Sequence, residues 1–167
     1  MRAAFFLDRD GVINRKLPEG QYVSNTNEFE FLPGAVEAVR ILNNRGFLTI
    51  VITNQRGIGR SLMSTADLKA VHKAMLTGFK NGGADLTDIF YCPHDIPDRC
   101  VCRKPQPGLI WRALTRYDID LTRSCLAGDS ASDMLLGQRV GCKTFLITPE
   151  NPLIKVVDQI PNVSLPT

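Results

Sequence analysis

Two aspartates, Asp8 and Asp10, stand at the end of an apolar run that extends from Ala3 to Leu7. The run predicts a buried strand, and side chains alternate along a strand, so both carboxylates would project to one side with Arg9 turned away. Gly11 follows and permits an immediate turn. One carboxylate could attack phosphorus and form an aspartyl-phosphate while the other transfers protons. A solvated polar turn would also explain a single pair of this kind, so the choice between a catalytic pair and a simple turn depends on the rest of the chain.

Three further groups of polar residues follow the ends of predicted strands: Thr53 to Arg56, Arg103 with Lys104, and Asp129 with Asp133. Parallel strands end at one edge of a sheet, so these groups should converge on the first aspartate pair. Phosphoryl transfer needs a fixed cation, hydrogen-bond donors and a metal ion around the phosphate oxygens. Lys104 could supply the cation, Thr53 and Asn54 the donors, and Asp8 with Asp129 the oxygen ligands of Mg²⁺.

A second group of residues has the composition of a metal site: Cys92, His94, Cys100 and Cys102. Three thiolates and one imidazole complete a tetrahedral shell and leave no position for a catalytic water, which predicts a structural zinc ion. Reduced free thiols are the alternative. Zinc would fix the loop immediately before Arg103 and Lys104. The other two cysteines, Cys125 and Cys142, lie in apolar strands and are predicted to be buried hydrophobes.

Strands and helices alternate along the chain. Strands are predicted over 3–7, 47–53, 88–91, 124–127 and 143–147, and helices after Pro33, over 64–79, over 107–117, after 129 and near 153–160. This order predicts a doubly wound, mostly parallel α/β sheet of five or more strands in a single domain, 1–167. Leu76 and Trp111 are expected in the core, His72 in a surface or packing role, and segment 15–30 as a flap.

Composition excludes several classes of protein. With 44% hydrophobic and 22% charged residues, the chain is typical of a soluble globular protein rather than a disordered or fibrous one. The sequence has no long apolar run and no signal-peptide pattern, so we expect a cytoplasmic protein without a membrane partner. The net charge of +3 is scattered along the chain. We therefore expect no nucleic-acid partner. We also expect a monomer.

The chain resembles the haloacid dehalogenase (HAD) superfamily in four motifs that occur in order: Asp8-Arg9-Asp10-Gly11, Thr53-Asn54, Lys104 and Gly128-Asp129-x-x-x-Asp133. The resemblance implies that Asp8 is a nucleophile, Asp10 the general acid and base, and Lys104 the neutralising cation. It further implies a Mg²⁺ ion held by Asp8, the backbone carbonyl of Asp10 and Asp129, with Asp133 in support.

The Cys-x-His and Cys-x-Cys-Arg-Lys-Pro segments, together with Thr-Asn-Gln, resemble two groups within that superfamily. These are the heptose 1,7-bisphosphate phosphatases and the histidinol-phosphate phosphatase domains, which carry a zinc-bound loop. The resemblance implies a Mg²⁺-dependent phosphomonoesterase for a small phosphorylated substrate, a sugar bisphosphate, with histidinol phosphate as the alternative. Gln55, Arg56 and Arg103 would contact the rest of the substrate.

The intervals 10–53 and 54–104 are too short for an inserted cap domain, so a capless site is expected. An alternative from another class is a zinc-stabilised binding module without catalytic activity.

Overall fold

Five parallel strands form the sheet within residues 1–161 and 163, the residues that this computed structural model describes. The strands are β1 (Ala4–Leu7), β2 (Leu48–Asn54), β3 (Asp88–Cys92), β4 (Cys125–Gly128) and β5 (Lys143–Leu146). Their order across the sheet is β3-β2-β1-β4-β5, and every neighbouring pair is parallel. The predicted doubly wound parallel sheet is confirmed.

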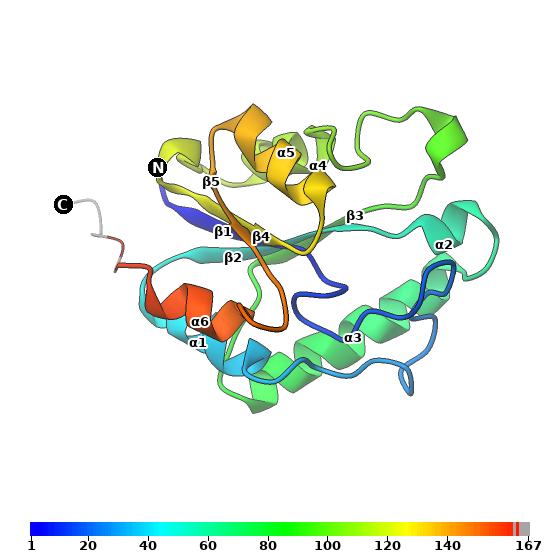
Figure 1. Ribbon diagram of the computed structural model, residues 1–167, viewed down its shortest axis with the longest axis horizontal. Helices are drawn as coiled ribbons and strands as arrows, with labels where there is room; N and C mark the ends of the chain where they lie inside the picture. Colours follow the sequence, from blue (N-terminus) through cyan, green and yellow to red (C-terminus); the bar gives the residue numbers. More distant parts are fainter. Residues whose placement is uncertain (162, 164–167) are drawn as a thin grey trace.

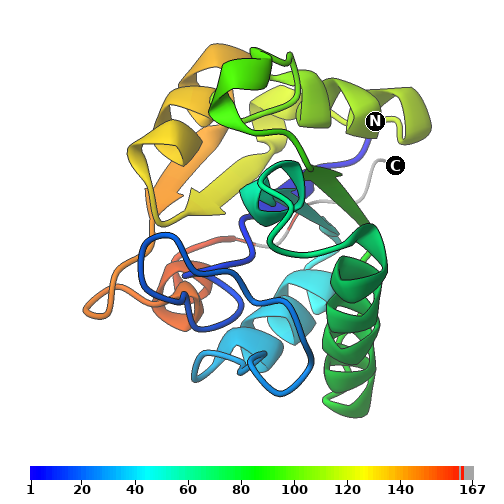
Figure 2. The same ribbon diagram turned by 90° about the vertical axis from the view of Figure 1, so that its right-hand side faces the viewer.

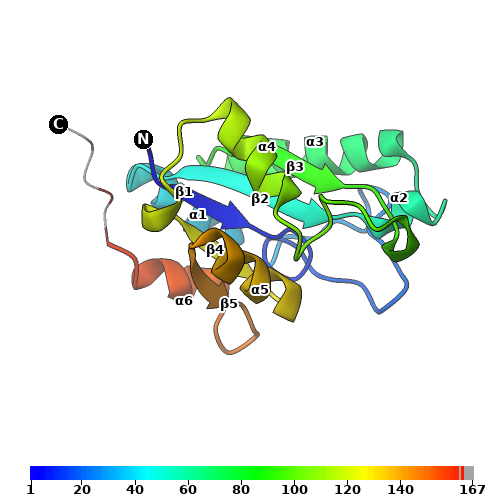
Figure 3. The same ribbon diagram turned by 90° about the horizontal axis from the view of Figure 1, so that it is seen from above.

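Helices cover both faces of the sheet, which gives three layers (Figures 1 and 3). On one face lie α1 (Ala35–Asn44), α3 (Thr65–Asn81) and α6 (Leu153–Asp158), and on the other α4 (Gly108–Arg116) and α5 (Ala131–Val140). Phe5 and Leu7 of β1 pack into the first core, whereas Ala4 and Phe6 pack into the second. Strands buried on both faces are apolar throughout, and this explains the continuous apolar runs in the sequence.

The strand order reverses between β1 and β4, because β2 and β3 lie beyond β1 while β5 lies beyond β4. Open α/β sheets bind ligands outside the carboxyl ends of the strands at such a switch point. Asp8 follows β1 and Asp129 follows β4, so both flank this position. Figure 2 views the molecule from this edge, where the loop after β1, the short helix α2 (Arg56–Gly59) and the loop after β3 surround the strand ends.

The connections that could hold a cap are short. The chain between β1 and β2 contains α1, and the chain between β2 and β3 contains α2 and α3, with no other helix or strand in this described stretch. The expected capless arrangement is confirmed. No helix in the described part of the chain combines the length and the apolar character needed to cross a membrane.

Two predicted core residues are exposed. Trp111 is 54% exposed and Leu76 is 42% exposed. Each stands next to the buried stripe of its helix, where Ile110 and Met75 face the sheet. A helix turns by about 100° per residue, so the neighbour of a core residue lies on its flank. The prediction that these two residues lie in the core, which relied on their apolar side chains, is therefore wrong.

Candidate active site

A buried lysine lies between two aspartates at the carboxyl edge of the sheet. Lys104 Nζ is 2.9 Å from Asp8 Oδ1 and 2.6 Å from Asp133 Oδ1. The side chains of Lys104 and Asp133 are 2% and 0% exposed, and that of Asp8 is 12% exposed. The backbone N–H of Arg9 also donates to Asp8 Oδ1, at 2.7 Å. Three segments that are distant in the sequence thus meet around one ammonium group.

Burial and neighbouring charges shift the pKa values of Asp8 and Lys104. Burial raises the pKa of Asp8 to about 7, the ammonium of Lys104 opposes this rise, and the carboxylate of Asp133 adds to it. For Lys104, burial works against the charged form, but the carboxylates of Asp8 and Asp133 outweigh it and raise the pKa of the amine. Lys104 is therefore a permanent cation at neutral pH.

Asp133 is oriented by the first turn of α5. Ser130 and Asp133 form a capping box, in which Ser130 Oγ donates to Asp133 Oδ2 at 2.7 Å. Gly128 provides the space for this aspartate, since a Cβ on Gly128 would lie 2.2 Å from the Asp133 Cβ. The motif from 128 to 133 thus fixes an acceptor for Lys104 at the start of the helix.

Asp129 adds a third carboxylate to a group that could hold a metal ion. Carboxylate oxygens of Asp8, Asp129 and Asp133 all lie within 4.8 Å of one another. Oxygen donors of this kind are those that Mg²⁺ prefers, so the residues fit a magnesium ion. Lys16, from the loop after β1, donates to Asp129 Oδ2 at 2.7 Å, although its own side chain is 57% exposed. Gly11 has a φ of +86°, and a Cβ there would lie 2.3 Å from Asp129 Oδ2.

Three donors hold the carboxylate of Asp10. Arg9 Nη2 and Asn14 Nδ2 donate to Oδ1 at 2.8 and 3.0 Å, and Gln55 Nε2 donates to Oδ2 at 3.0 Å. Burial opposes ionisation of Asp10, but the guanidinium of Arg9 and the hydrogen bonds from Asn14, Arg9 and Gln55 outweigh burial and lower its pKa. The resting form of Asp10 is therefore the carboxylate.

Sequence reasoning did not identify Arg9, Asn14 or Lys16 as parts of the site. The only signal for Arg9 and Asn14 was their position beside Asp10, and Lys16 stood in the predicted flap.

Two polar residues at the end of β2 are more deeply buried than the sequence indicated. Thr53 and Gln55 are each 1% exposed, and Gln55 Nε2 donates to Thr53 Oγ1 at 2.9 Å. Asn54 Oδ1 accepts from the backbone N–H of Lys104 at 3.0 Å, and Asn54 Nδ2 donates to the Lys104 carbonyl at 3.3 Å. Asn54 thus uses both ends of its amide to hold the backbone that carries the lysine.

A cavity of about 310 Å³ opens above these groups. Its wall includes Asp8, Asp10, Lys104 and Asp129, with Arg103 and the loop segment 16–23 on the outer side. Arg56 also lines the cavity, and its guanidinium forms an ion pair with Asp95 in the loop after β3. Arg103 Nη1 is buried without a hydrogen-bond partner among the described residues.

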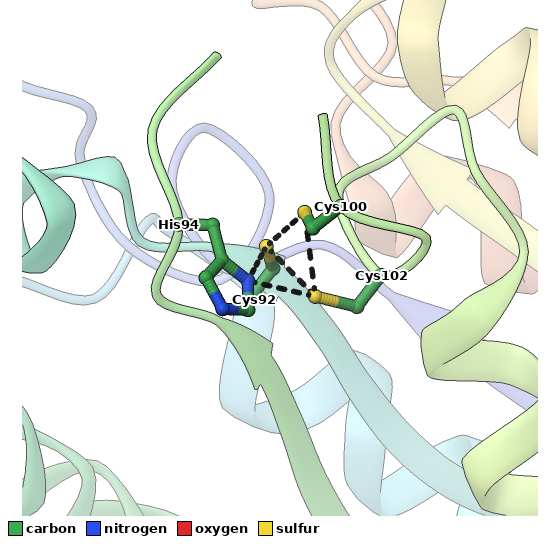
Figure 4. Close-up of side chains that lie close together, drawn as sticks. All are labelled: Cys92, His94, Cys100 and Cys102. Atoms are coloured by element: carbon green, nitrogen blue, oxygen red, sulfur yellow. Dashed lines mark hydrogen bonds between the residues drawn. The ribbon is translucent and has the colours of Figure 1, made fainter. Parts of the chain in front are cut away.

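The predicted zinc ligands cluster at the end of β3 and in the loop that follows it (Figure 4). The Sγ atom of Cys102 is 3.1 Å from that of Cys92 and 3.6 Å from that of Cys100, and His94 Nδ1 is 3.2 Å from Cys102 Sγ. Ligands at about 2.3 Å from a tetrahedral zinc ion are separated by roughly 3.7 Å, so this donor set fits zinc. The next residues in the chain are Arg103 and Lys104, which the cluster would anchor.

Comparison with known proteins bears on the same residues. A family model described as HAD-hydrolase-like matches residues 101–151. The D-glycero-beta-D-manno-heptose-1,7-bisphosphate 7-phosphatase of Rhodopseudomonas palustris is 37% identical over 157 residues, which cover 90% of this chain and 86% of that protein. The D-glycero-alpha-D-manno-heptose-1,7-bisphosphate 7-phosphatase of Mycobacterium tuberculosis is 42% identical over 136 residues, or 81% of this chain and 71% of that protein.

A solved structure extends the similarity over nearly the whole chain. The crystal structure of D,D-heptose 1,7-bisphosphate phosphatase from B. bronchiseptica, complexed with magnesium and phosphate, superposes with a TM-score of 0.86 at 33% identity. The match covers 95% of this chain and 97% of that one. The resemblance inferred from the motifs is confirmed, and the chain belongs to the heptose 1,7-bisphosphate phosphatase family of the HAD superfamily.

Proposed function

We propose that this protein is a Mg²⁺-dependent phosphomonoesterase that removes the 7-phosphate from D-glycero-D-manno-heptose 1,7-bisphosphate. One observation carries the proposal beyond family membership: a buried, permanently charged Lys104 holds Asp8 at the floor of a cavity that Asp129 also lines. This arrangement supports the assignment of Asp8 as nucleophile, Lys104 as cation and Asp129 as a metal ligand around a phosphate bound in the cavity. The relatives are named for both the alpha and the beta anomer, so both anomers are candidate substrates.

The reaction follows from the roles of the two aspartates. Asp8 attacks phosphorus in line, so a bond forms between its carboxylate oxygen and phosphorus while the bond from phosphorus to the sugar oxygen breaks. Asp10, a carboxylate at rest, takes the proton of a monoprotonated substrate phosphate and passes it to the departing sugar oxygen. Asp10 is then a carboxylate and removes a proton from a water molecule, which attacks phosphorus and releases inorganic phosphate and free Asp8. Lys104 balances negative charge throughout.

Two metal ions fit the chain. Asp8, Asp129 and the backbone carbonyl of Asp10 would hold Mg²⁺, with Asp133 in support, and the bound ion would neutralise charge on the phosphate oxygens. Zinc would be held by the four residues of Figure 4 in a structural role. A cytoplasmic location is also proposed, because a cluster of reduced cysteines of this kind suits a reducing compartment.

Substrate contacts outside the reacting phosphate are assigned to Arg103 and Arg56. The unpartnered Nη1 of Arg103 supports this assignment, since a second phosphate in the cavity would satisfy it. Thr53 and Gln55 lie behind the cavity wall, where Gln55 contacts Asp10. We therefore assign Gln55 to the support of the acid and base instead of direct substrate contact.

Phosphate release measured in parallel tests the proposal. The two heptose bisphosphate anomers and histidinol phosphate should be compared at several concentrations with Mg²⁺, using the wild type and Asp8→Asn. We expect the highest kcat/KM for one heptose anomer and no covalent turnover by Asp8→Asn. A preference for histidinol phosphate would contradict the proposal and identify the protein as a histidinol-phosphate phosphatase. Salt-dependent oligonucleotide binding without phosphate release would favour the non-catalytic module.

A further inference from the structure

A buried arginine connects the acid and base to a distant helix. The side chain of Arg9 is 0% exposed. Its Nη2 atom donates to Asp10 Oδ1 at 2.8 Å, and its Nη1 atom lies 3.3 Å from Nε2 of His72 in α3. His72 is 8% exposed and its ring packs edge-on against Tyr91, with centroids 6.1 Å apart. Nε of Arg9 has no hydrogen-bond partner among the described residues.

The chemistry of the contact fixes the form of the histidine. A guanidinium can only donate hydrogen bonds, so His72 must accept at Nε2 and carry its proton on Nδ1. Burial, followed by the neighbouring charge of Arg9, lowers the pKa of His72 to about 4. The neutral ring that can hold Arg9 is thus the dominant form at neutral pH.

The cost of this arrangement indicates a purpose beyond packing. A buried ion pair contributes little net stability compared with apolar residues of the same size. Arg9 nevertheless lies directly beside Asp10, and its two terminal nitrogens contact Asp10 and His72, which are 62 positions apart in the sequence. Asn14 and Gln55 also donate hydrogen bonds to Asp10, but neither lies in α3. Among these three donors, Arg9 is the one that contacts α3, through His72.

We propose that Arg9 and His72 are positioning residues for Asp10: His72 fixes the guanidinium, and the guanidinium fixes the carboxylate beside the leaving oxygen of the substrate. The proposal rests on the acid and base role of Asp10 in the proposed function. Without His72, the guanidinium loses its second anchor and Asp10 gains freedom to move. Small displacements of a catalytic group are costly, because proton transfer requires hydrogen-bond geometry.

Two substrates with different leaving groups distinguish a loss of Asp10 positioning from a general loss of active-site structure. A sugar oxygen needs a proton as it departs, whereas para-nitrophenolate is a weak base that departs without one. For His72→Leu we expect kcat/KM to fall by about tenfold or more on the heptose bisphosphate and by no more than about threefold on para-nitrophenyl phosphate. His72→Gln retains an acceptor and should stay within about threefold of wild type on both substrates. His72→Asn, whose amide is too short to reach Arg9, should behave like His72→Leu.

Two controls make each outcome decisive. Met75→Ala truncates a buried residue on the same helix and should lower thermal stability without changing the ratio of the two kcat/KM values. Equal losses on both substrates for His72→Leu and His72→Asn, or no loss on either, would overturn the positioning proposal. Asp10→Asn is measured alongside. If Asp10→Asn itself shows no dependence on the leaving group, the acid role in the proposed function fails instead.

Discussion

Replacing Lys104 with methionine is the sharpest single perturbation of this site. Methionine has a similar length and preserves the apolar contacts of the side chain, but it leaves Asp8 and Asp133 buried without their cation. The two ion pairs measure 2.9 and 2.6 Å, and the lysine side chain is only 2% exposed. Breaking a buried pair by removing one partner costs about 3–5 kcal/mol. We expect the free energy of unfolding to fall by about this amount in magnesium-free buffer with zinc retained.

A second lysine in the same cavity provides the matched control. Lys16 pairs with Asp129 at 2.7 Å, but its side chain is 57% exposed. Exposed pairs contribute about 0–1 kcal/mol, so Lys16→Met should change the free energy of unfolding by no more than that. Urea titration monitored by circular dichroism measures both variants on the same scale. Phosphate release by Lys104→Met should fall by about 100-fold or more, the rate equivalent of the lost electrostatic stabilisation.

The pH dependence checks the electrostatic origin of the loss. Burial raises the pKa of Asp8 from its ordinary value of 3.8 to about 7 even with Lys104 present, and removal of the cation moves it higher. When a folded-state pKa lies above the unfolded value, the unfolded chain ionises first as the pH rises, and stability falls until the folded-state pKa is passed. Lys104→Met should therefore lose more stability at about pH 8 than at about pH 6. A loss equal to that of Lys16→Met, or one independent of pH, would refute the reasoning.

Three further predictions concern the turn, the acid and the zinc loop. Gly11→Ala should weaken the activation of phosphate release by Mg²⁺, because its Cβ would lie 2.3 Å from Asp129 Oδ2, whereas Gly20→Ala, with a φ of +81° but open space around it, should not. Asp10→Asn should lower kcat by about 100- to 10,000-fold in the phosphate-release assay, the usual contribution of acid and base catalysis, and a smaller loss would contradict its role. Cys102→Ser should lower the zinc content measured by atomic emission, and the melting temperature and the activity should fall with it. A variant that loses zinc but keeps its activity would show that zinc is not needed to position Lys104.

The sheet and its active edge could be predicted because their signals are local. Apolar runs such as 3–7 and 47–53 define buried parallel strands, and the polar residues that follow them meet at one edge by geometry alone. The candidate metal ligands carry their own signal in residue type and spacing, as with Cys100 and Cys102. These parts of the fold required no knowledge of distant contacts.

The remaining features depend on contacts that leave no local pattern. The bond between Arg9 and His72 joins residues 63 positions apart, and nothing beside His72 in the sequence indicates it. Asn54 was predicted as a phosphate donor, and nothing in the sequence indicated that its amide also holds the backbone of Lys104. Helix α2, Arg56–Gly59, is only four residues long and too short for a helical periodicity. Trp111 has an apolar side chain, but the fold places it on the flank of its helix.

The central claim is that Asp8 forms a covalent bond to phosphorus, and trapping that bond tests it most directly. Enzyme mixed with the heptose bisphosphate and Mg²⁺ would be quenched during turnover and reduced with borohydride, which converts an aspartyl-phosphate to homoserine. Peptide mass spectrometry should then find homoserine at position 8 in the wild type and not in Asp8→Asn. Turnover with an unmodified Asp8, or with the label on another residue, would contradict the account.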